Sequence, residues 1–187
     1  MGKIICLYGL AACGKTTQAD KMSATTGMVQ FGMGENLRAE IESGSELGQK
    51  IKTYVDSGTL ITDDLMEQVI KKVGDEAKAK GIIFDGFPRM ISQAEMLDRA
   101  ATEMNMEISS VIYLNVSVDE AVKRLTLRAE SGSRADDKDP VAVKNRLGVF
   151  AKESVPLLEY YRQKGNLVEI NGELSIEEVF AEIQKYL

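Results

Sequence analysis

Near its N-terminus the chain carries a phosphate-binding loop between an expected strand and an expected helix. Residues 9–16 read Gly-Leu-Ala-Ala-Cys-Gly-Lys-Thr, which matches the spacing G-x-x-x-x-G-K-[ST]. The loop follows an apolar run at residues 4–8 and precedes a stretch that suits a helix. Glycines let backbone N–H groups turn toward phosphate oxygens, and the helix adds the positive end of its dipole. The sequence therefore predicts a nucleoside triphosphate site, with Lys15 at the terminal phosphates and Thr16 at Mg²⁺.

Short apolar runs alternate with segments of helical periodicity along the rest of the chain. The runs occupy residues 4–8, 28–31, 82–84, 111–114 and 167–170. Such runs are typical of parallel strands that helices cover on both faces. We expect an α/β fold of the P-loop NTPase type, with a five-stranded parallel sheet flanked by helices.

Local signals predict where several helices begin and end. Ser-x-x-Glu capping boxes predict helix starts at Ser92, Ser117 and Ser175. Pro156 interrupts a long helical pattern, so we expect a kink or break near residues 154–155.

Two stretches fit the alternation of strands and helices poorly. Residues 32–61 are helical and punctuated by glycine, and they contain no strand-like run. Residues 129–139 are short and polar. We expect both to be insertions that move over a site.

Charge and composition exclude several classes of function. The net charge of −6 argues against a nucleic-acid surface. No apolar run approaches the roughly 18 residues that a membrane span needs, and no signal pattern precedes the first strand. Because the chain has no histidine, a histidine general base and histidine metal ligands are excluded. Cys6 and Cys13 have no C-x-x-C partner, so we expect buried free thiols in a cytoplasmic protein.

Four further segments carry residues suited to phosphoryl chemistry. Residues 34–38 (Gly-Glu-Asn-Leu-Arg) open a helix, and residues 85–89 (Asp-Gly-Phe-Pro-Arg) directly follow a strand. Arg124 and Arg128 are one helical turn apart, and residues 134–137 read Arg-Ala-Asp-Asp. With the phosphate loop, these segments make the chain resemble the adenylate kinase family, in its short-lid form, over nearly its whole length. The resemblance implies phosphoryl transfer from Mg-ATP to AMP, giving two ADP.

The resemblance also implies a role for each matching residue. ATP would be contacted by Gly9, Ala12, Cys13, Gly14, Lys15, Thr16, Thr17, Arg124 and Gly172. AMP would be contacted by Gly32, Met33, Arg38, Thr59, Leu60, Ile61, Gly86, Arg89, Gln93, Arg134 and Arg146. The catalytic groups around the transferred phosphoryl group would be Lys15, Arg89, Arg128, Arg134 and Arg146. Mg²⁺ would be held by Thr16 and Asp85, largely through water.

The distribution of arginine supports this interpretation independently. All of the arginines except Arg99 and Arg162 fall at positions that match the family's phosphate-binding arginines. The planar guanidinium group binds phosphate oxygens in a bidentate way. An acidic protein that gathers its arginines in this manner is suited to a polyanionic ligand.

The resemblance divides the single domain into a core, an insertion and a lid. The core would comprise residues 1–31, 62–128 and 140–187, the monophosphate-binding insertion residues 32–61, and the short lid residues 129–139. The expected partners are ATP and a nucleoside monophosphate, most simply AMP. We expect a monomer, with no nucleic-acid polymer and no membrane as partner.

Two departures from the family pattern leave the acceptor base open. The family's loop usually has Pro-Gly in its middle and reads Gly-Lys-Gly-Thr, whereas this chain has Ala12 at the inner glycine and Thr16 after the lysine. Met33 stands where the family usually has a threonine that contacts the acceptor base, although Gln93 favours adenine. A UMP/CMP kinase or a broad nucleoside monophosphate kinase is therefore an alternative. A third hypothesis is a nucleotide sensor without turnover, against which the intact Lys15 and other charged residues argue.

Overall fold

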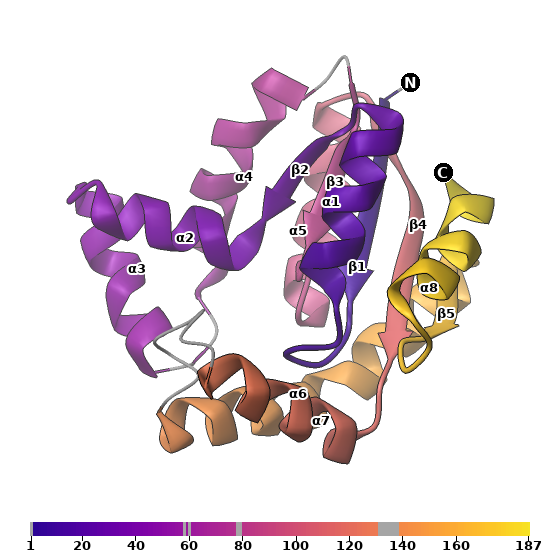
Figure 1. Ribbon diagram of the computed structural model, residues 1–187. Coiled ribbons are helices and arrows are strands. Elements are labelled where there is room, and N and C mark those ends of the chain that lie inside the picture. Colours follow the sequence, from indigo (N-terminus) through magenta and orange to yellow (C-terminus); the bar gives the residue numbers. More distant parts are fainter. Residues whose placement is uncertain (1, 58, 60, 78–79, 131–138) are drawn as a thin grey trace.

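A five-stranded parallel sheet forms the centre of the computed structural model, which describes residues 2–57, 59, 61–77, 80–130 and 139–187 (Figure 1). Its strands are β1 (Gly2–Tyr8), β2 (Val29–Gly32), β3 (Ile82–Asp85), β4 (Met106–Asn115) and β5 (Leu167–Asn171). They lie in the order β2-β3-β1-β4-β5, and every neighbouring pair is parallel. The predicted α/β fold and all of its strands are confirmed.

Alternate residues of β1 face opposite sides of the sheet. Ile4 and Cys6 belong to one buried cluster, to which α4 (Asp63–Ala77), α5 (Ile91–Glu103) and α7 (Pro140–Lys164) also contribute. Ile5 and Leu7 belong to a second cluster on the other face, shared with α1 (Lys15–Thr26) and α8 (Ile176–Ile183). A short 3₁₀ turn, η2 (Gln184–Tyr186), follows α8. Because helices cover both faces, each strand contains a short apolar run, as the sequence indicated.

The remaining helices lie outside these two layers. The pair α2 (Met33–Glu42) and α3 (Glu46–Ser57) extends beyond the edge strand β2, and α6 (Val118–Glu130) crosses the carboxyl ends of the strands with part of α7 (Figure 1). The helices predicted within residues 32–61 are present as α2 and α3, but Gly32 is the last residue of β2. Within the described part of the chain, no helix has both the length and the apolar character that a membrane crossing requires.

Capping at the starts of α8 and α6 follows the predicted pattern to different extents. Ser175 and Glu178 form the complete reciprocal box at α8. At α6 the Ser117 hydroxyl accepts a hydrogen bond from the Glu120 N–H at 3.3 Å, as predicted. The backbone N–H of Ser117, however, donates to Glu173 at 2.9 Å rather than to Glu120. A residue distant in sequence thus completes this cap.

One prediction about helix limits is wrong, and of the kink or break predicted near residues 154–155 the break is absent. Ser92 does not cap α5, because the helix already begins at Ile91, and the Ser92 hydroxyl instead donates to Asp63 at 3.1 Å. Helix α7 continues through Pro156 without a break. Ser154 and Leu157 are buried on either side of the proline. This packing holds the helix in place despite the backbone hydrogen bond that proline cannot donate.

Helices α2 and α3 approach each other most tightly at Gly48. A Cβ added to Gly48 would lie 2.1 Å from the main-chain oxygen of Glu40. Because that oxygen belongs to the backbone of α2, it can move aside only if the two helices separate.

We therefore expect Gly48→Ala to lower the free energy of unfolding by about 1–3 kcal/mol, the usual effect of overpacking. Gly148→Ala is the matched control, because it lies inside α7 with no atom within 4 Å of an added Cβ. Replacing a glycine by alanine at such a position in a helix interior should raise the free energy of unfolding by roughly 0.5–1 kcal/mol. Urea unfolding of both variants measures these changes, and shifts of the same sign would contradict the close approach.

Candidate active site

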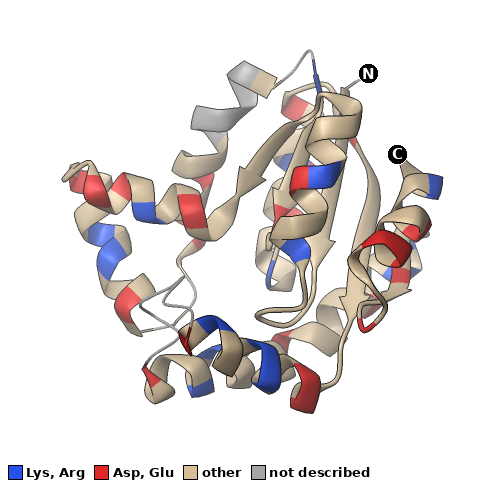
Figure 2. Ribbon diagram, viewed as in Figure 1, with Lys and Arg blue, Asp and Glu red and all other residues tan. Residues whose placement is uncertain are grey.

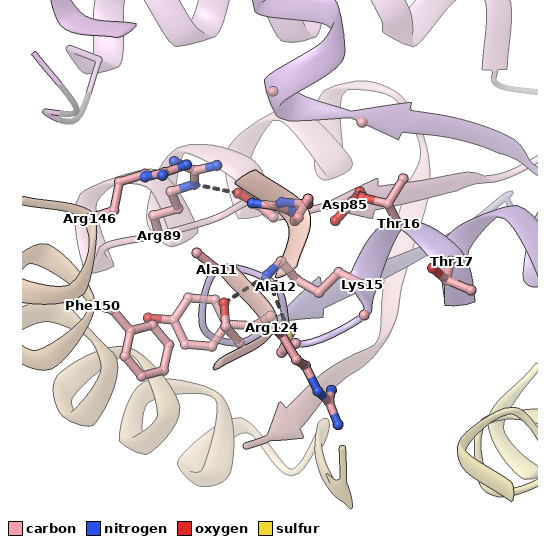
Figure 3. Close-up of a pocket in the computed structure, with 18 of the residues that line it drawn as sticks. Ala11, Ala12, Lys15, Thr16, Thr17, Asp85, Arg89, Arg124, Arg146 and Phe150 are labelled. Atoms are coloured by element: carbon pink, nitrogen blue, oxygen red, sulfur yellow. Dashed lines mark hydrogen bonds between the residues drawn. The ribbon is translucent and has the colours of Figure 1, made fainter. Parts of the chain in front are cut away.

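A cavity of about 440 Å³ opens over the loop that joins β1 to α1 (Figure 3). From this loop and the first turn of α1 it is lined by Gly9, Ala11, Ala12, Cys13, Gly14, Lys15, Thr16 and Thr17. The cavity lies at the carboxyl end of β1, where the sheet continues to β3 on one side and to β4 on the other. Open α/β sheets bind ligands at such a position.

Backbone conformation fixes the shape of the loop. Gly9 and Gly14 have φ of +148° and +96°. A Cβ at Gly9 would also lie 2.7 Å from the main-chain oxygen of Leu114. Ala12 has φ of +63°, a left-handed conformation that usually requires glycine. Ala12 therefore stores some backbone strain in the loop.

The Lys15 ammonium group lies within the loop. Its Nζ donates to the main-chain oxygens of Gly9 and Leu10, both at 2.8 Å, and lies 3.4 Å from the Cys13 sulfur. The Lys15 ammonium group therefore faces the loop, at the wall of the cavity. Cys6 and Cys13 are both buried free thiols, as predicted.

Thr16 and Asp85 form a direct hydrogen bond beside the loop. The Thr16 hydroxyl donates to the Asp85 carboxylate at 2.5 Å, and Asp85 is only 8% exposed at the end of β3. Mg²⁺ prefers oxygen ligands and usually combines one or two protein groups with phosphates and water. This pair of oxygens fits such an ion. No larger group of acidic or cysteine side chains suited to a metal occurs among the described residues.

A second cavity of about 100 Å³ adjoins the first and is lined largely by α2, α3 and neighbouring residues. Gly34, Arg89 and Arg146 line both cavities. Arg89 is fixed by two hydrogen bonds: its Nε donates to Gly86 O at 2.8 Å, and its backbone N–H donates to Gln93 Oε1 at 2.9 Å. Figure 3 shows Arg89 and Arg146 extending toward the same space beside the phosphate loop. The two cavities therefore meet at a pair of guanidinium groups.

Further basic residues come from α6. Arg124 and Arg128 both line the first cavity, and Figure 2 shows basic residues along α6. Arg124 Nη1 donates to Gly172 O at 3.1 Å, and its Nε donates to Glu120 at 2.8 Å. This hydrogen bond holds the pKa of the Glu120 carboxyl below its ordinary value. Arg162, by contrast, forms salt bridges on the surface with glutamates at 2.7 Å.

The structure distributes the predicted site residues between the two cavities as follows. The predicted ATP-binding residues line the first cavity, except Gly172, which is joined to it through Arg124. Of the predicted AMP-binding residues, the second cavity contains Met33, Arg38, Thr59, Ile61, Arg89, Gln93 and Arg146. Gly32 and Gly86 line the first cavity instead. Leu60 and Arg134 lie outside the described residues.

Sequence reasoning missed several residues of the cavity walls. Tyr8 and Phe150 line the first cavity, with ring centroids 5.4 Å apart in a stacked arrangement. Burial raises the pKa of Tyr8, so its hydroxyl remains protonated. Tyr54 lines the second cavity. The spacing of Phe150 four residues after Arg146, on the same helix face, was the available signal.

The Thr16–Asp85 hydrogen bond predicts a measurable effect on stability. Thr16→Val removes the donor to a buried carboxylate and should lower the free energy of unfolding by roughly 1.5–3 kcal/mol. Thr16→Ser keeps the hydroxyl and should retain most of the stability. Thr17→Val, at the exposed neighbouring position, is the control and should change stability by less than about 0.5 kcal/mol. Denaturant titration without nucleotide measures all three, and equal effects at positions 16 and 17 would refute the role of this bond.

Comparison with known proteins agrees with this arrangement. A model of the adenylate kinase family matches residues 7–166. The chain is 42% identical to the adenylate kinase of Caulobacter sp. (strain K31) over 182 residues, which cover 97% of this chain and 96% of that protein. It is 40% identical to the adenylate kinase of Bacteroides fragilis (strain YCH46), with the same coverage, and 38% identical to that of Maricaulis maris (strain MCS10), covering 96% of this chain and 95% of that protein. This chain belongs to the adenylate kinase family.

Proposed function

We propose that this chain is an ATP:AMP phosphotransferase that transfers a phosphoryl group reversibly from Mg-ATP to AMP and forms two ADP. One observation carries the proposal. The cavity over the phosphate loop and the smaller cavity beside α2 and α3 share the side chains of Arg89 and Arg146. Two nucleotides bound with their phosphates toward each other would meet at these side chains. The names of the relatives, all adenylate kinases, support the same activity.

In this proposal the larger cavity binds the donor. The loop N–H groups and the start of α1 would hold the ATP phosphates, and Lys15 would exchange its carbonyl contacts for phosphate oxygens. Arg124 would stack on the donor adenine near the main chain of Gly172. Thr16 and Asp85 would hold Mg²⁺, partly through water. The bound ion would supply positive charge and orientation for the phosphates.

The smaller cavity would bind the acceptor. Its volume of about 100 Å³ is below the roughly 300–1,000 Å³ of sites that enclose a whole drug-sized ligand, so it suits a base. The sugar and phosphate would then extend toward the shared arginines. Gln93, only 1% exposed, would hydrogen-bond the base, and Arg38 with Arg89 would bind the acceptor phosphate.

The reaction needs positioning and positive charge rather than a general base. The attacking oxygen belongs to a phosphate that is already ionised, so the absence of histidine is compatible with turnover. Lys15, Arg89, Arg128 and Arg146 would stabilise the negative charge that is spread over the transferred group. Exclusion of water would prevent hydrolysis of the donor.

We propose that residues 32–61 form the monophosphate-binding insertion, residues 129–139 a short lid, and the rest of the chain the core.

We also propose a monomer in the cytoplasm that has no nucleic-acid polymer or membrane as a partner. Short edge strands, β2 and β5, leave little sheet edge for association. The net charge of −6 disfavours polyanions other than those bound in the arginine-lined cavities.

Met33 favours a second candidate function, that of a UMP/CMP kinase or a broad nucleoside monophosphate kinase. Met33 lines the acceptor cavity at 1% exposure, where the family usually has a threonine. Its thioether can pack against a base but cannot offer a hydroxyl hydrogen bond.

A panel of AMP, GMP, CMP and UMP with Mg-ATP as donor tests the proposal. We expect AMP to give the highest kcat/KM in an assay coupled to ADP formation. A preference for CMP or UMP would establish the second function instead. Binding of ATP with no turnover of any acceptor would indicate a nucleotide sensor.

Single-residue variants test the assigned roles. Lys15→Ala and Arg89→Ala should each lower kcat by about 10²-fold or more, because each removes charge that stabilises the transition state. Arg162→Ala is the control, since Arg162 pairs with Glu159 and Glu169 outside both cavities, and it should keep kcat close to that of the unmodified enzyme. Steady-state kinetics at saturating ATP and AMP give these values. A near-normal kcat in the Lys15 or Arg89 variant would show that the residue has been misassigned.

A further inference from the structure

A hydrogen bond joins the acceptor-side helices to α7. Asn145 Nδ2 donates to the main-chain oxygen of Ser57 at 2.9 Å, between positions 88 residues apart in the sequence. Ser57 is the last residue of α3, and Asn145 lies on α7 immediately before Arg146. In Figure 1 this end of α3 lies near the start of α7.

Both partners of this bond adjoin the acceptor cavity. The final carbonyl groups of a helix have no partner within that helix, and Asn145 supplies one for Ser57. The Ser57 hydroxyl also lies 2.7 Å from the hydroxyl of Thr59, which lines the second cavity. On the other side, the neighbouring Arg146 lines both cavities. The bond thus connects one wall of the acceptor cavity to the helix that carries the shared arginine.

Apolar contacts also attach the α2–α3 pair, because Met33, Leu37 and Ile51 belong to the same buried cluster as Ile4 and Cys6. Helix α2 packs against α3 and the end of β2, and α7 is the core helix that α3 contacts most. A net hydrogen bond changes an equilibrium by about two- to tenfold. Loss of the bond should therefore lower the fraction of molecules in which α3 lies against α7, without unfolding the protein.

We propose that Asn145 is a positioning residue for the acceptor, holding α3 against α7 so that Thr59 and Arg146 face the acceptor cavity together before a nucleotide binds. The proposal rests on the function proposed above for this cavity. The apparent affinity for a ligand falls in proportion to the fraction of protein in the competent arrangement. Asn145 should consequently affect AMP binding and leave ATP binding unchanged.

Two variants of Asn145 test this inference. Asn145→Ala removes the donor, and Asn145→Asp keeps the shape but places an acceptor opposite the Ser57 oxygen. We expect each to raise the Kd and KM of AMP by about two- to tenfold, with the Kd of ATP and the Tm close to those of the unmodified protein. Gln163→Ala is the matched control, because it removes an exposed side-chain amide that donates to Glu159 within α7. It should leave the AMP affinity unchanged.

A distance measurement without nucleotide separates this inference from the proposed function. Because Cys6 and Cys13 are at most 2% exposed, dyes can be attached selectively to cysteines introduced at Gln49 on α3 and Lys152 on α7. Asn145→Ala should lengthen or broaden the inter-dye distance. Unchanged AMP affinity in both Asn145 variants, or an unchanged distance, would overturn the inference. Absence of AMP turnover in the unmodified protein would instead overturn the proposed function, and the distance would still decide whether Asn145 holds α3.

Discussion

Several positive charges must lie around one cavity while no phosphate is present, and this constraint shapes the site. The repulsion among them is offset by oxygen atoms that a ligand can replace. The Lys15 ammonium group is bound by two loop carbonyls, and Arg89 by the carbonyl of Gly86. Arg124 is bound by Glu120 and the carbonyl of Gly172. These contacts orient the cations around the cavity, and in the proposed function a bound phosphate would take the place of some of these oxygens.

The parallel sheet brings this arrangement together from distant parts of the sequence. Because parallel strands end at the same edge, the loop after β1 and the segment after β3 become neighbours, and Leu7 pairs in register with Asp85. The Thr16–Asp85 hydrogen bond joins these two segments. Helices α6 and α7 cross the same edge and add further arginines (Figure 1). Burial of both faces of the sheet makes the strands rigid, which is what placement of charged groups requires.

Features with a local signal were predictable from the sequence, and features set by distant contacts were not. The strands and the phosphate loop were predicted because apolar runs and glycine spacing are local patterns. The prediction of a cap at Ser92 was wrong because α5 already begins at Ile91. The Ser92 hydroxyl instead donates to Asp63, which is remote in sequence. The break predicted near Pro156 is absent, because packing of the buried residues beside it outweighs the local effect of proline. Phe150 was overlooked because its spacing from Arg146 is a weak signal, which a core aromatic residue on a helix would also give.

The two departures from the family pattern have different physical consequences. Ala12 lies in the left-handed region, at φ of +63°, where an alanine is strained and a glycine is not. This departure therefore bears on backbone strain in the loop and adds no new side-chain chemistry. Met33, by contrast, changes the chemistry of the wall that a base would meet, because a thioether replaces a hydroxyl inside a buried cavity. Arg89 and Arg146 line the same cavity and are not altered by this departure, so Met33 bears on the choice of base rather than on the proposed phosphoryl transfer.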